Sequence, residues 1–190
     1  MDSRIPRPSA PRIEPTTTPS PLLQRLVDGG TFAADGRPLN IFATLDLHPE
    51  LHQKFMVFAG YLLNKGLVPA REREIVILRV GWNCRSIYEF GQHTLIGLRE
   101  GLTASEVAAL TLDIDAHRWS RDDQALIALA DELCADDCVS EATWQRLAVR
   151  WSEQELMELL LVAGNYRLVS GFLNSVGVQR DAGVPGWPEV

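Results

Sequence analysis

Residues 69–82, with the sequence PAREREIVILRVGW, are the part of the chain that decides the fold. A proline at the first position and charged residues in the first turns are typical signals of a helix start. The second half, from Ile75 to Val80, is almost continuously apolar instead of apolar along one stripe, which predicts a helix that is buried on all sides. We therefore expect a central helix that begins at Pro69.

The segments around this helix have the same helical character. Apolar residues recur at steps of three and four over residues 49–63, and Thr103 and Ser152 are each followed three positions later by a glutamate, as in a capping box. No clear alternation of apolar and polar residues indicates a strand. The sequence predicts an all-α helical bundle, with helices near residues 22–27, 39–45, 49–63, 69–82, 85–100, 103–110, 120–133, 140–147 and 156–176.

The first twenty residues differ from the rest of the chain. Six of the 11 prolines fall within residues 1–21, where no apolar periodicity is visible. We expect an extended or disordered arm over residues 1–20, able to reach a neighbouring subunit, followed by a single all-helical domain over residues 21–190. The total length of 190 residues suits one domain.

Composition excludes several classes of partner. The chain has 18 Lys and Arg against 25 Asp and Glu, for a net charge of −7, which is a poor match for nucleic acid or for an anionic membrane surface. Three cysteines, Cys84, Cys134 and Cys138, are too few for a disulfide framework and suit a reducing compartment. With no apolar signal segment at the N-terminus, we expect a cytoplasmic protein.

One group of polar residues could carry chemistry. On a helix, Ser86 and His93 project about 20° apart, and Glu89 lies within about 40° of His93. Glu74 can join them from the neighbouring helix. Their apolar surroundings predict partial burial, so Glu89 and His93 could exchange a proton near neutral pH. The alternative is a helix-face pair without function, with Glu74 in a structural ion pair to Arg71 or Arg79.

These residues also carry a family resemblance. The motifs REIVILRVGW at residues 73–82, YEFGQH at residues 88–93 and GLREGLT at residues 97–103 resemble the alkylhydroperoxidase D-like / carboxymuconolactone decarboxylase family. Weaker similarity extends over residues 38–188. The resemblance implies an all-helical protein that assembles as a homo-oligomer, as a dimer, trimer or hexamer, with sites near the subunit contacts.

The redox branch of this family has a Glu followed by Cys-x-x-Cys-x-x-x-His. Alignment on His93 places Glu74 at the Glu position, Ser86 at the first Cys and Glu89 at the second. Thiol peroxidase activity is therefore not expected, because neither serine nor carboxylate can form a disulfide. Cys84 would point about 160° away from Ser86 on a helix and does not replace the missing thiol.

The decarboxylase branch lacks the thiol pair and uses acid/base side chains without metal or organic cofactor. The resemblance then implies that His93 is the acid, that Glu89 orients it and that Glu74 is a second acid/base. The expected substrate-binding residues are Ser86, Tyr88, Arg73 and Arg79.

We expect a small-molecule substrate, a carboxylic acid or lactone, and a decarboxylation or a related lyase or isomerase proton transfer. The alternative is a non-catalytic ligand-binding or scaffold homo-oligomer with the same fold. We expect no metal, no cofactor, no nucleic acid and no membrane partner.

Overall fold

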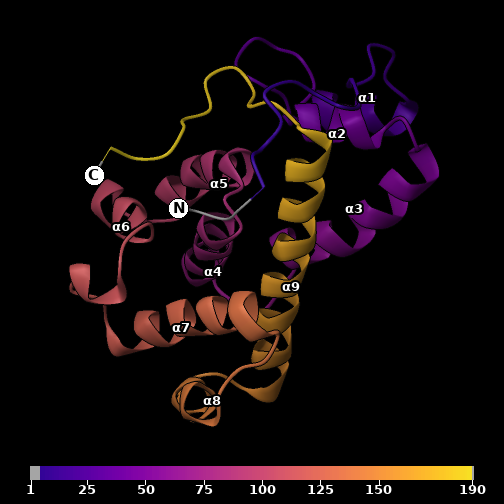
Figure 1. Cartoon of the computed structure of the whole chain (residues 1–190). Coiled ribbons are helices and arrows are strands. Elements are labelled where there is room, and N and C mark those ends of the chain that lie inside the picture. Colours follow the sequence, from indigo (N-terminus) through magenta and orange to yellow (C-terminus); the bar gives the residue numbers. More distant parts are fainter. Residues whose placement is uncertain (1–4, 190) are drawn as a thin grey trace.

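The computed structural model describes residues 5–189, and the chain over those residues is built of helices and loops (Figure 1). Residues 1–4 of the expected arm and Val190 lie outside this range. The all-α prediction is confirmed. The helices are α1 Pro21–Asp28, α2 Asn40–Leu45, α3 Pro49–Asn64, α4 Ala70–Asn83, α5 Ile87–Arg99, α6 Ala104–Ala109, α7 Arg121–Asp136, α8 Glu141–Ala148 and α9 Glu153–Val176, with a 3-10 turn at Ile114–Ala116.

Helix α4 is the centre of the core, as its sequence predicts. Every residue from Arg73 to Gly81 is buried. The helix packs against α5, α7 and α9, which together surround it (Figure 1). Its apolar run is therefore explained by neighbours on all sides. Two charged residues are buried with it: Glu74, directly before the run, and Arg79, within it.

Helix α9 is the longest helix and runs the length of the molecule (Figure 1). Among the described residues it is the one helix long and apolar enough to span a membrane, although 56% of its most apolar stretch is buried inside the protein. Leu159 and Val162 on this helix are fully buried in the main core. These contacts identify α9 as a core helix.

Several helices begin at the capping residues that were predicted from the sequence. Thr103 and Ser152 both form complete capping boxes, with Glu106 and Glu155 respectively. Each such cap stabilises its helix by about 1 kcal/mol.

A buried carboxylate holds the turn between α3 and α4. Glu158 of α9 accepts hydrogen bonds from the backbone N–H groups of Leu67 and Val68, at 2.8 and 2.9 Å. Gly66 lies directly against this carboxylate, so that a Cβ at that position would collide with it. The turn and the long helix are therefore joined by a contact that needs a glycine.

The proline-rich arm is extended and lies across its own chain. The N–H of Arg12 donates to the carbonyl of Val176 at 2.7 Å, and that of Thr16 donates to Ala43 at 3.0 Å. Ser20 caps α1 and also donates to Asp46. The described part of the arm, residues 5–20, is thus attached to the ends of α9 and α2.

The segment after α9 crosses α5. The Trp187 ring packs 5.1 Å from both Trp82 and Phe90, measured between ring centroids. Earlier in the same segment, Asp181 accepts a hydrogen bond of 2.5 Å from the Tyr88 hydroxyl. A Cβ at Gly91 would collide with the Pro185 carbonyl, so the segment and the helix approach each other too closely for a larger residue.

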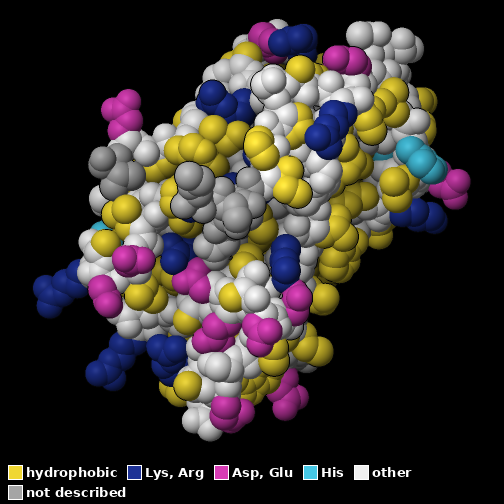
Figure 2. Space-filling model, in the orientation of Figure 1, with side chains coloured by type: hydrophobic (Ala, Val, Ile, Leu, Met, Phe, Trp, Pro, Cys, Tyr) yellow, Lys and Arg dark blue, Asp and Glu magenta, His cyan; other side chains and the backbone are white. Residues whose placement is uncertain are grey.

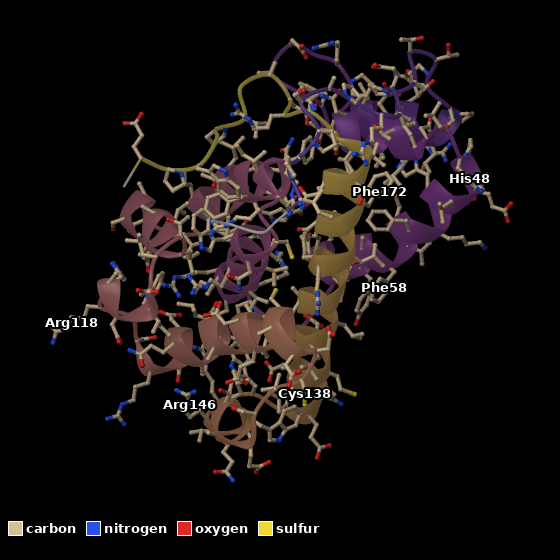
Figure 3. All side chains as sticks on the ribbon, viewed as in Figure 1. His48, Phe58, Arg118, Cys138, Arg146 and Phe172 are labelled. Atoms are coloured by element: carbon tan, nitrogen blue, oxygen red, sulfur yellow. The ribbon has the colours of Figure 1, made fainter. Side chains whose placement is uncertain are left out.

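Exposed apolar side chains gather on α3 and α9, two helices in contact with each other. Figure 2 shows hydrophobic surface on the side of the molecule formed by these helices, and Figure 3 labels Phe58 and Phe172 there. The most exposed members are Val57, Leu168, Met157 and Leu51. Such a patch is common where proteins contact partners.

Candidate functional site

Three of the predicted residues meet between α4 and α5. His93 Nδ1 lies 2.6 Å from Glu74 Oε2, and His93 Nε2 lies 3.1 Å from Glu89 Oε1. We call these three residues the charged cluster. Both ring nitrogens of one imidazole thus face a carboxylate, one from each helix. The helical spacing that places Glu89 beside His93 is the i,i+4 spacing recognised in the sequence.

The charged cluster is almost completely removed from solvent. The exposed fraction of the side chain is 0% for Glu74, 5% for Glu89 and 6% for His93. Burial by itself would lower the pKa of His93, but the negative charges and hydrogen bonds of Glu74 and then Glu89 outweigh it and raise this pKa to about 10. At neutral pH the ring is therefore an imidazolium that donates to both carboxylates.

This charge state corrects one expectation. We predicted that Glu89 and His93 exchange a proton near pH 7, on the assumption that burial and pairing would roughly cancel. That expectation weighed only the pairing with Glu89, whereas Glu74 also faces the ring and raises the pKa of His93, so pairing dominates. The ring is poised to act as an acid, while the proton acceptor has to be a carboxylate.

Tyr166 of α9 is a further member of the site that the sequence analysis missed. Its ring meets the His93 ring edge to face, with the centroids 4.8 Å apart at 84°. Burial, followed by the charges of Glu89 and Glu74, holds the pKa of Tyr166 well above its usual value. Its hydroxyl therefore stays protonated. Tyr166 lies within the span of residues 38–188 that resembles the family, but nothing in its local sequence pattern marks it as a neighbour of His93.

Arg73 adds a second positive charge beside the cluster. Its Nε lies 3.8 Å from Glu74 Oε1, too far for a hydrogen bond, and neither of these two buried atoms has a hydrogen-bond partner among the described residues. The arginine is buried all the same. A buried guanidinium held this loosely has donor capacity left for an anion, as expected of a carboxylate-binding residue.

The other predicted residues are placed differently. Arg79 binds Asp131 through Nε and a terminal nitrogen, at 2.6 and 2.9 Å, and its remaining terminal nitrogen donates to two backbone carbonyls. Tyr88 binds Asp181. These contacts engage both side chains in the fold and place them outside the charged cluster, and Tyr88 also lines a surface pocket together with Arg7 and Arg180. Ser86 is buried with no hydrogen-bond partner for its hydroxyl among the described residues.

The alternative that Glu74 forms a structural ion pair with Arg71 or Arg79 is wrong. Arg71 pairs with Glu106 at 2.5 Å and with Asp123 at 2.9 Å, and Arg79 pairs with Asp131. Neither arginine reaches Glu74, whose closest charged partner is His93.

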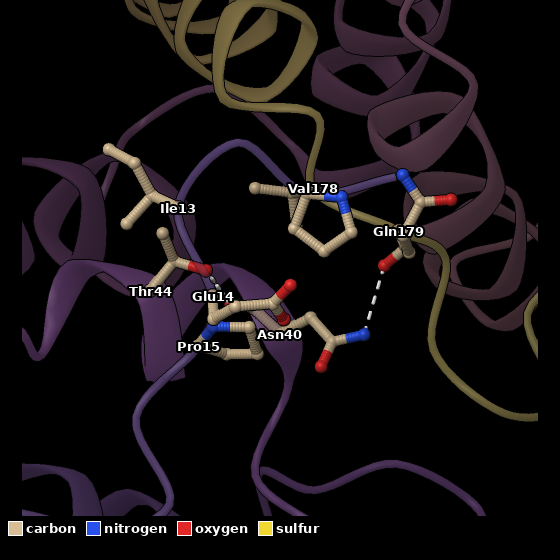
Figure 4. Close-up of a pocket in the computed structure, with 8 residues that line it drawn as sticks. Ile13, Glu14, Pro15, Asn40, Thr44, Val178 and Gln179 are labelled. Carbon is tan, nitrogen blue, oxygen red and sulfur yellow. Dashed lines mark hydrogen bonds between the residues drawn. The ribbon is translucent and has the colours of Figure 1, made fainter. Parts of the chain in front are cut away.

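Two surface pockets lie elsewhere on the described part of the chain. One, of about 80 Å³, is formed by the arm, α2 and the segment after α9, with Ile13, Asn40 and Val178 in its wall (Figure 4). The other, of about 100 Å³, includes Arg7 and Arg180. Neither is lined by a residue of the charged cluster, which is packed against its neighbours.

The fold is that of alkylhydroperoxidase D-like proteins. A peroxidase-related protein from Silicibacter superimposes with a TM-score of 0.76 at 11% identity, over 92% of this chain and 95% of its own. One from Ralstonia eutropha, with the alkylhydroperoxidase D core, gives 0.75 at 18% identity, over 90% and 94%. A variant of the debrominase Bmp8 in complex with 2,3,4-tribromopyrrole gives 0.77 at 15% identity, over 92% and 94%.

The family resemblance is confirmed at the level of sequence. Residues 49–131 match the carboxymuconolactone decarboxylase family, and this stretch contains all three members of the charged cluster. No curated protein matches the chain.

Proposed function

We propose that this protein is a cofactor-independent acid/base enzyme that acts on a small carboxylic acid or lactone, by decarboxylation or a related lyase or isomerase proton transfer. The observation that carries the proposal is the charged cluster. Burying ionised groups costs free energy that apolar residues of similar size would not cost, and clusters of this kind are concentrated at functional sites.

The charge states assign the roles. Arg73 holds the substrate carboxylate or another anionic group. When the bond to carbon dioxide breaks, its electrons form an enolate, which the His93 imidazolium stabilises and then protonates at carbon. For an isomerisation, Glu89 or Glu74 first takes the proton next to the carbonyl, and His93 stabilises the resulting oxyanion. The same carboxyl group then returns the proton to a different carbon of the enolate. Water restores the proton to His93 after turnover.

The tight packing around the charged cluster favours a second candidate function, a scaffold or ligand-binding protein. Neither of the two pockets described above is lined by the charged cluster, and the three side chains of the cluster are almost fully buried, so side chains around it have to move to admit a substrate. A scaffold or ligand-binding homo-oligomer, in which the cluster only joins α4 to α5, needs no such movement. We retain the cytoplasm as the expected compartment for both candidates, because the three cysteines are free thiols.

Proton transfer itself is the most direct test. Purified protein is incubated in D₂O with a panel of 3-oxo acids, unsaturated lactones and their open-chain acids, and NMR follows deuterium incorporation and carbon dioxide loss. We expect at least one compound to react, and His93→Gln to lower its rate by about 100-fold or more. His52→Gln is the matched control, since His52 is a buried histidine paired with Asp46 at 3.0 Å.

Melting temperature alone does not separate the two candidates. Removal of His93 leaves Glu74 and Glu89 buried without their shared cation, which destabilises the protein whether or not the ring is catalytic. Rates are therefore compared at a temperature where circular dichroism shows every variant folded. A folded wild type that reacts with nothing in the panel, alone or at high protein concentration, would favour the scaffold.

A further inference from the structure

Two cysteines from distant parts of the sequence meet outside the charged cluster. Cys84 is the C-cap of α4, and Cys134 lies in the last turns of α7. Both are free and half-buried, and the Cys134 thiol is hydrogen-bonded to the Cys84 sulfur. One turn earlier on α7, Asp131 accepts a hydrogen bond of 2.7 Å from Asn83, so the two helices are joined directly beside the thiols.

A third helix completes the surroundings of these thiols. Ser170 and Asn174 are four apart on α9, and the Asn174 side chain donates to the Cys84 carbonyl at 2.9 Å. The Ser170 hydroxyl is fully buried, has no nitrogen or oxygen partner within residues 5–189 and lies against the Cys84 sulfur. One turn before Ser170, Arg167 brings a positive charge close to both cysteines.

The two thiols differ in acidity. The hydrogen bond from Cys134, the charges of Arg167 and Arg7 and the Ser170 hydroxyl outweigh burial and lower the pKa of Cys84 to about 7. The same contact, together with burial, raises the pKa of Cys134. The contact between the two sulfurs and the nearby positive charges therefore favour the loss of one proton from the pair, which leaves a thiolate beside a thiol.

We propose that Cys84 and Cys134 are a redox-active pair that forms an intramolecular disulfide by exchange with a low-molecular-weight disulfide. Nothing in this proposal depends on acid/base catalysis by the charged cluster. It also differs from the redox arrangement of the resembling family, since neither cysteine occupies the positions of Ser86 and Glu89.

The exchange has two balanced steps. The Cys84 thiolate attacks one sulfur of a small disulfide, such as glutathione disulfide, forming a mixed disulfide and releasing one glutathione thiolate. Cys134 then loses its proton to solvent or to that thiolate and attacks the Cys84 sulfur, which releases the second glutathione. The protein loses two protons and two electrons, and the small disulfide gains them.

Oxidation of the wild-type chain tests the pair. Fully reduced protein is treated at pH 7 with glutathione disulfide, and intact mass and peptide mapping follow the products. We expect a species that has lost the mass of two hydrogens, a link between the peptides containing Cys84 and Cys134, and recovery of the reduced mass with dithiothreitol. Before oxidation, Cys84 should react with iodoacetamide about tenfold faster than an unperturbed thiol.

Single variants separate the two roles. Cys134→Ser should stop at a glutathione adduct on Cys84, and Cys84→Ser should abolish the internal link. Cys138→Ser is the matched control and should behave like wild type, because Cys138 is exposed at the far end of the turn after α7 (Figure 3). Wild-type protein that keeps all thiols reduced, or that links Cys138 instead, overturns the proposal.

Discussion

The charge on His93 gives the sharpest prediction. With a pKa of about 10, the ring should be almost entirely charged at pH 8, with about 1% neutral, whereas a histidine with the ordinary pKa of 6.5 would be about 97% neutral. The measurement is NMR of the protein with ¹⁵N-labelled histidine, in which the ring nitrogens report the charge directly. Only four histidines are present, so the signals can be assigned by single variants.

The two carboxylates should contribute unequally. Glu74 acts on the pKa of His93 more strongly than Glu89 does, so Glu74→Gln should lower this pKa further than Glu89→Gln. Glu100→Gln is the control, because Glu100 is an exposed residue at the C-terminal end of α5, the helix that carries Glu89 and His93. It should leave the titration of His93 unchanged.

The shift also predicts how stability depends on pH. A pKa raised from 6.5 to about 10 corresponds to at most about 5 kcal/mol of folding free energy. Because the folded-state pKa is raised, this contribution is fully present below pH 6.5 and is lost as the pH rises toward 10. The difference in unfolding free energy between wild type and His93→Gln should therefore shrink over that range.

The reasoning fails if His93 titrates at or below pH 6.5 in the folded wild type. That result would mean that desolvation outweighs the two carboxylates. The ring would then be neutral at pH 7, and the acid role assigned to it would be lost.

Three further predictions concern the fold and the assembly. Gly66→Ala should lower the free energy of unfolding in urea by about 1–3 kcal/mol, because its Cβ would collide with the buried Glu158 carboxylate, and an unchanged midpoint would contradict this close contact. Ser152→Ala should cost about 1 kcal/mol in the same assay by removing the α9 cap, with Ser105→Ala as a control that leaves a capping box in place. Leu161→Glu, on the exposed face of α9, should lower the mass measured by light scattering if the chain is a homo-oligomer, and a monomeric wild type would refute that expectation.

The central helix and the helix starts could be read from the sequence for clear physical reasons. A continuous apolar run with a proline at its start has few alternatives to a buried helix, and capping boxes depend only on residues three positions apart. The proximity of Glu89 and His93 follows in the same way from helical spacing, which is why these local features agree with the structure.

Contacts between distant segments were harder to predict. Whether Arg79 faces a substrate or Asp131 depends on the position of α7, which no local pattern contains. Tyr166 and the Cys84–Cys134 contact depend in the same way on how α9 and α7 pack against α4. The charge of His93 was misjudged for a related reason, because it depends on two carboxylates from different helices.

The segment that crosses α5 has a consequence for how the protein is made. Tyr88 and Asp181, which bind each other across this crossing, are 93 residues apart in the chain. During translation α5 therefore leaves the ribosome long before the residues that cover it, and Phe90 has no Trp187 ring to pack against until then. The nascent chain passes through a stage in which the helix carrying Glu89 and His93 is bare on one side, and this stage is where chaperones would act.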